Sequence, residues 1–95
     1  MSTKQAYQKK IQAQLDEWSA EIDKLRAQAD QADADAELAL RREIDNLREK
    51  QSDTRRKLDE MSSAGEDAWE DLKGGVESAS KSLGQALSSA YSRFN

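Results

Sequence analysis

The chain has 95 residues, of which 36% are charged and 36% hydrophobic, and its net charge is −4. Cysteine, histidine and proline are absent, which excludes disulfides, thiolate metal sites and histidine acid–base chemistry. The mild negative charge gives no general attraction to nucleic acid. A composition rich in Ala, Leu and charged residues without proline is typical of long helices and coiled coils. Intrinsic disorder is the competing interpretation, and periodicity distinguishes the two.

The first half of the chain carries core-type residues at alternating steps of four and three. This a/d pattern lasts for more than three heptads and predicts a coiled-coil seam. Trp18 lies on the seam, so we expect it to be a core side chain. The whole series is Ile11, Leu15, Trp18, Ile22, Leu25, Ala29, Ala32 and Ala36, and we expect its first five members to pair helices.

The pattern continues after two successive four-residue steps, from Ala36 to Leu40 and from Leu40 to Ile44. Such a stutter unwinds a supercoil locally without breaking the helix. Two polar seam residues, Gln51 and Thr54, are expected to fix the register of the pairing. The second association seam is predicted to consist of Leu40, Ile44, Leu47, Leu58 and Met61.

No glycine or proline interrupts residues 4–62, so the sequence predicts a single helix over this range. Such a helix would be roughly 90 Å long and could not lie inside a globule of its own making. It therefore needs a partner helix, from its own chain or from another. The alternative is a turn in the Ala29–Ala39 stretch, which is rich in Ala and Asp.

The first candidate helix boundary is the segment Ser62-Ser63-Ala64-Gly65-Glu66. Gly65 can end the long helix in a left-handed conformation, or Ser63 and Glu66 can form a capping box that opens a second helix over about 65–93. Both interpretations place a boundary near residue 64. Folding back at Gly65 would give a helical hairpin, whereas a chain that does not fold back would pair only with another protomer. Gly74-Gly75 is expected to weaken or bend the second helix.

The second predicted helix is amphipathic, with bulky apolar residues on one side and many serines on the other. Helices with weakly charged Ser/Gly faces can dock on curved membranes, but small residues also allow close packing between helices. Both interpretations remain open at this stage. The residues expected to dock on lipid or on a partner are Trp69, Leu72, Val76, Leu83, Leu87, Tyr91 and Phe94.

Motifs that carry chemistry are not found: there is no phosphate-binding glycine loop, zinc spacing or catalytic triad. Asp30, Asp33 and Glu37 share a helical face, but one exposed helix lacks the converging oxygens of a calcium site. The short basic clusters have no interleaved aromatic residues for base stacking, so nucleic-acid binding is not expected. We expect no catalytic residues, no cofactor and no metal.

Several segments resemble a family of small bacterial coiled-coil proteins, commonly labelled as stress-response proteins or uncharacterised. The resemblance lies in YQKKIQAQLDEWSAEIDKLRAQA, REIDNLREKQ and AGEDAWEDLKGGVESA, and it covers essentially the whole chain. The contexts of Trp18 and Trp69 are its most specific parts. The resemblance implies a bacterial, cytoplasmic, helical protein without known catalytic activity, and it supplies no binding site.

The sequence thus predicts an all-α protein with a long coiled-coil helix in 1–63 and an amphipathic helix in 64–95. We expect a helical hairpin that assembles into a bundle, most simply as a homodimer. The expected function is non-enzymatic self-association, in scaffolding or protection under stress. The alternatives are a peripheral membrane protein and an accessory subunit of a larger complex. The N-terminus has no signal-peptide pattern, so a soluble, cytoplasmic protein is expected.

Overall fold

The described chain consists of three α-helices and no strands. The computed structural model describes the backbone of residues 3–94 and the side chains of residues 3–93. Helix α1 spans Thr3–Gln31, α2 spans Ala34–Ser63 and α3 spans Trp69–Phe94. The predicted all-α class is confirmed.

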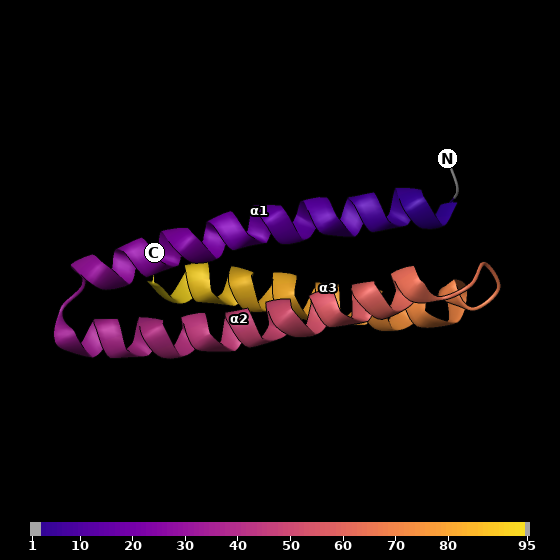
Figure 1. The fold of residues 1–95 in the computed structure, drawn as a ribbon. Helices are drawn as coiled ribbons and strands as arrows, with labels where there is room; N and C mark the ends of the chain where they lie inside the picture. Colours follow the sequence, from indigo (N-terminus) through magenta and orange to yellow (C-terminus); the bar gives the residue numbers. More distant parts are fainter. Residues whose placement is uncertain (1–2, 95) are drawn as a thin grey trace.

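The three helices lie side by side and alternate in direction (Figure 1). The chain turns between α1 and α2 at one end and between α2 and α3 at the other, so α1 and α3 run parallel. The molecule measures 51 × 19 × 18 Å. One apolar core runs along its length, formed by all three helices.

The single helix expected over 4–62 is wrong, because the chain turns back at Ala32 and Asp33. Asp33 is the N-cap of α2, with an extended backbone, and its Oδ1 accepts a hydrogen bond from the Ala36 N–H at 2.9 Å. Asp35 and Glu37 follow in the first turn, where the positive end of the helix dipole stabilises carboxylates.

Burial of the two seams explains why the chain folds back. A straight helix would leave them in water, and each large apolar side chain gains about 1.5–3 kcal/mol when it is buried. Folding back brings the seam of α1 against that of α2 without the entropy cost of recruiting a second chain. The alternative expected for the Ala29–Ala39 stretch is therefore the one observed.

Helix α2 ends at Ser63 and α3 begins at Trp69, on either side of the expected boundary, but neither predicted cap forms. Gly65 does not have a positive φ, so it is not a left-handed helix terminator. Ser63 is the last residue of α2 rather than the cap of α3. Instead, the Gly65 carbonyl accepts hydrogen bonds from the N–H groups of Ala68 and Trp69 at 3.0 and 3.1 Å, and this turn leads into α3.

Helix α3 begins four residues later than the predicted position 65 and continues through Gly74 and Gly75. Both glycines are exposed, and a Cβ added at either would meet nothing within 4 Å. They are therefore not required for close packing between helices.

Candidate association surfaces

The ten residues predicted to pair helices all contribute to one core within the chain. Nine of them are at most 6% exposed: Ile11, Leu15, Ile22, Leu25, Leu40, Ile44, Leu47, Leu58 and Met61. Trp18 is partly buried and packs against this core. In this conformation both seams are covered by helices of the same chain, so a second chain cannot reach them.

The two polar seam residues differ in their environment. Thr54 is completely buried, and its hydroxyl donates a hydrogen bond to the Lys50 carbonyl at 2.8 Å in the preceding turn. Gln51 is only partly buried. Thr54 thus satisfies its hydroxyl within α2 and needs no partner from another helix.

The apolar face of α3 also points into the core. Trp69, Val76, Leu83 and Leu87 are at most 4% exposed, Tyr91 is partly buried, and Leu72 is 37% exposed. The side chain of Phe94 lies outside the described residues. Docking on lipid through this face would require α3 to leave α1 and α2.

An aromatic cluster that the sequence analysis missed joins the N-terminal ends of α1 and α3. The ring centroids of Tyr7 and Trp69 are 6.3 Å apart, and Lys73 Nζ lies 5.1 Å from the Tyr7 centroid and 5.9 Å from that of Trp69. Burial, with a smaller contribution from nearby Glu77, raises the pKa of Tyr7 to about 12. A signal was present, because Tyr7 lies four residues before Ile11 and extends the seam backward.

A second contact between α1 and α3 is made by Trp18, whose indole lies against Gly84. A Cβ added at Gly84 would be 3.1 Å from Trp18 Cζ2, so the glycine makes room for the ring. Beside this contact lies a groove of about 470 Å³ between the two helices, lined in part by Tyr7, Ile11 and Trp18. Ser80 Oγ donates a hydrogen bond to Gln14 Oε1 across the groove at 3.2 Å.

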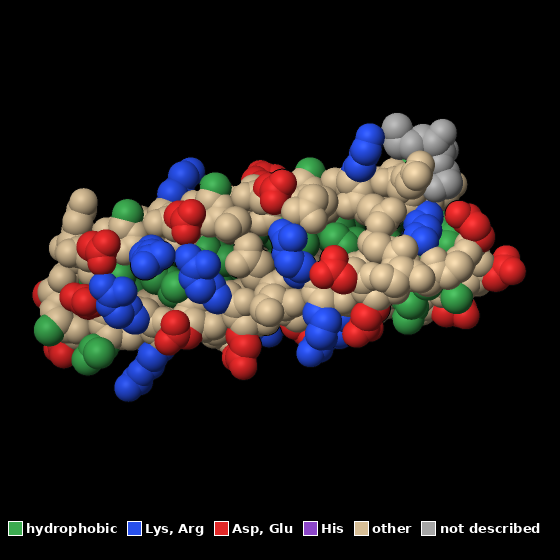
Figure 2. Space-filling view, in the orientation of Figure 1, with side chains coloured by type: hydrophobic (Ala, Val, Ile, Leu, Met, Phe, Trp, Pro, Cys, Tyr) green, Lys and Arg blue, Asp and Glu red, His purple; other side chains and the backbone are tan. Residues whose placement is uncertain are grey.

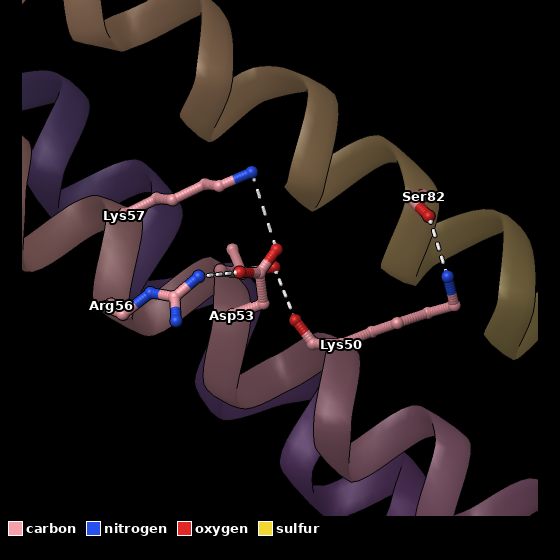
Figure 3. Close-up of polar contacts among 6 residues, drawn as sticks. Lys50, Asp53, Arg56, Lys57 and Ser82 are labelled. Carbon is pink, nitrogen blue, oxygen red and sulfur yellow. Dashed lines mark hydrogen bonds and ion pairs between the residues drawn. The ribbon is translucent and has the colours of Figure 1, made fainter.

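Contacts of α2 with its neighbours include polar pairs at the surface. Lys50 Nζ donates to Ser82 Oγ at 3.1 Å and links α2 to α3, whereas Asp53 pairs with Arg56 and Lys57 on its own helix (Figure 3). These exposed ion pairs each contribute at most about 1 kcal/mol. Because both ion pairs lie within α2, they do not hold this helix against its neighbours.

The outer surface is covered by charges of both signs. Figure 2 shows Lys, Arg, Asp and Glu spread over one face, with hydrophobic side chains visible along the line where α1 meets α2 and in small separate patches elsewhere. Leu38, at 60% exposure, and Leu72 are the exposed large hydrophobic side chains of the described residues. Association of intact folded chains would therefore have little apolar surface to bury.

The acidic residues around the turn between α1 and α2 have structural partners. Arg41 pairs with Asp30 at 2.9 Å and with Glu37 at 2.9 Å, and Asp33 caps α2. Among the residues that the structure describes, no group of three or more acidic side chains could hold a metal ion. Within residues 3–94, no helix has both the length and the apolar character that crossing a membrane requires.

Comparison with known proteins gives no relative: no family model, curated protein or solved structure matches this chain.

Proposed function

We propose that the protein acts without catalysis, by pairing its helices with those of a second copy, in scaffolding or in protection under stress. The supporting observation is that the seams of α1 and α2 fit each other along their length within one chain. Each copy carries both seams, so the α1 seam of one copy fits the α2 seam of another equally well. Two copies can therefore associate with the same contacts that hold one copy together.

Docking of α3 on lipid is the weaker proposal. Val76, Leu83 and Leu87 would have to leave the core before they could reach a membrane. Flotation with small anionic vesicles tests this proposal, and binding that requires α3 would favour it. An accessory role in a larger complex would show as co-purification with another protein from the native cell.

Molar mass as a function of concentration tests self-association. The measurement combines light scattering with sedimentation equilibrium, from about 10 µM to above the ~1 mM effective concentration typical of short connections. We expect the mass to rise from 10.7 kDa toward twice that value. A mass of 10.7 kDa throughout, including after refolding at the highest concentration, would overturn the proposal.

A matched control distinguishes pairing through the seams from nonspecific association through exposed apolar side chains. The double variant Leu38→Gln, Leu72→Gln removes the large hydrophobic side chains that are exposed among the described residues, and it leaves both seams intact. We expect it to associate like the wild type. Loss of association in this variant would place the contact on the surface leucines and refute pairing through the seams.

A further inference from the structure

The turn between α1 and α2 is short and has no backbone conformation that is reserved for glycine. Only Ala32 and Asp33 lie between the two helices, and neither has a positive φ. Asp33 has φ −69° and ψ 171°. Its φ is already close to the helical value, so rotation about ψ is the main change that would bring this residue into a continuous helix.

The turn contains a start signal for α2 but no stop signal for α1. No glycine follows Gln31, and the last turn of α1 contains no basic residue. Asp30 places a carboxylate at the negative end of the helix dipole, where it is unfavourable until Arg41 pairs with it. A continuous helix would instead pair the carbonyl groups that α1 leaves open at its end.

The seam also continues through the turn. Leu25, Ala29, Ala32, Ala36 and Leu40 follow one another at steps of four, three, four and four. In a helix over 3–63 these residues would lie along one stripe, and the small alanines would let two such helices approach closely where they cross. The same sequence therefore fits a closed turn and an open, straight helix.

Helix α1 is the element best placed to separate. Its contact with α3 is the least extensive of the three helix pairs, and that of α2 with α3 is the most extensive. The groove of about 470 Å³ lies on the weak side, between α1 and α3. When the first turn opens, the α2–α3 hairpin can therefore remain folded.

We infer that two copies of this chain exchange α1, an inference that rests on the proposed self-association. In the exchanged dimer the helix over 3–63 is continuous and roughly 90 Å long. The two long helices run antiparallel, with α1 of each copy on α2 and α3 of the other. The core contacts of the closed chain are retained, so the balance depends on the turn and on concentration.

Two turn variants with opposite effects test the exchange. Asp33→Ala removes the cap that favours the closed turn. Such a cap favours the closed turn by about fivefold in each chain, so its loss in both chains should lower the dissociation constant of the dimer by about 25-fold. Inserting Gly-Ser-Gly-Ser between Ala32 and Asp33 keeps the cap but interrupts the straight helix, and this chain should remain monomeric. Each protein is refolded from denaturant at about 1 mM, and its mass, helicity and small-angle scattering are measured.

The outcomes separate the inference from the function on which it rests. A dimer of roughly 90 Å or longer in the wild type and Asp33→Ala, but not in the insertion variant, supports exchange. Dimers that form equally in all three proteins would leave self-association standing and overturn exchange. If neither the wild type nor Asp33→Ala exceeds 10.7 kDa, both proposals fail. If Asp33→Ala loses helicity, the comparison of the wild type with the insertion variant decides whether α1 is exchanged: a long dimer in the wild type alone supports exchange, and equal dimers in both overturn it.

Discussion

Alanine substitutions at two glycines of α3 test how closely α1 approaches this helix. Gly75 and Gly84 both lie inside α3, so alanine gains the same helix propensity at each. Their surroundings differ. A Cβ at Gly75 meets nothing within 4 Å, whereas a Cβ at Gly84 would lie 3.1 Å from Trp18 Cζ2.

The magnitudes follow from these distances. Replacing an exposed helix-interior glycine with alanine stabilises by about 0.5–1 kcal/mol, so Gly75→Ala should raise Tm by about 2–8 °C. At Gly84 the same gain is offset, because 3.1 Å is shorter than the ~3.5–4.0 Å of an ordinary carbon–carbon contact. Overpacking of this kind costs about 1–3 kcal/mol, which makes the net effect of Gly84→Ala neutral to destabilising by about 2 kcal/mol.

Urea denaturation and thermal melts, followed by circular dichroism, measure both effects. The double variant Gly84→Ala, Trp18→Ala serves as the control, since removing the indole should restore the gain from alanine at position 84 relative to Trp18→Ala alone. Equal stabilisation by Gly75→Ala and Gly84→Ala would refute the close packing of Trp18 on α3.

Two further predictions concern titration and the core. Burial raises the pKa of Tyr7 and Tyr91 to about 12, against about 10 in the unfolded chain, so their contribution to stability is complete below pH 10 and is lost as the pH rises toward 12. Near-ultraviolet absorbance should show tyrosinate forming near pH 12 in the folded protein, and half-titration near pH 10 would contradict the burial. Leu15→Ala should destabilise by about 2–5 kcal/mol and Leu38→Ala by at most about 0.5 kcal/mol, because Leu15 is fully buried and Leu38 is 60% exposed. Similar urea midpoints for the two variants would argue against the assigned core.

Much of the fold could be predicted from periodicity. The steps of four and three mark eleven buried residues of α1 and α2, nine of them among the ten expected to pair helices. The stripe of the last helix marks Trp69, Val76, Leu83 and Leu87. Spacing marks these residues because an amphipathic helix of a small bundle buries one stripe of its surface. It does not show whether the stripe is covered by the same chain or by a partner.

The turn at Ala32 and Asp33 could not be predicted in the same way. Periodicity reports which residues are buried, but it does not report which helix covers them. The same seam is buried whether its partner belongs to the same chain or to another. The local signal, an Asp cap followed by Asp35 and Glu37, is worth about 1 kcal/mol and is weak beside the helix propensity of the surrounding alanines.

The contacts between α1 and α3 were also beyond the sequence analysis. That Trp18 meets Gly84, and Tyr7 meets Trp69, depends on the parallel alignment of two helices that are not consecutive in the chain. A change in the length of either turn would alter this alignment without changing any helical period. Nothing in the sequence distinguishes Gly84 from the other small residues of α3.

The two aromatic contacts give the protein its own optical reporters. Both tryptophans lie where α1 meets α3, Trp18 from one helix and Trp69 from the other. Separation of α1 would move both indoles into water and shift their fluorescence to the red, while circular dichroism would change little if the helices themselves stayed intact. A spectral shift at constant helicity would therefore record rearrangement of the helices, whereas loss of both signals together would record unfolding.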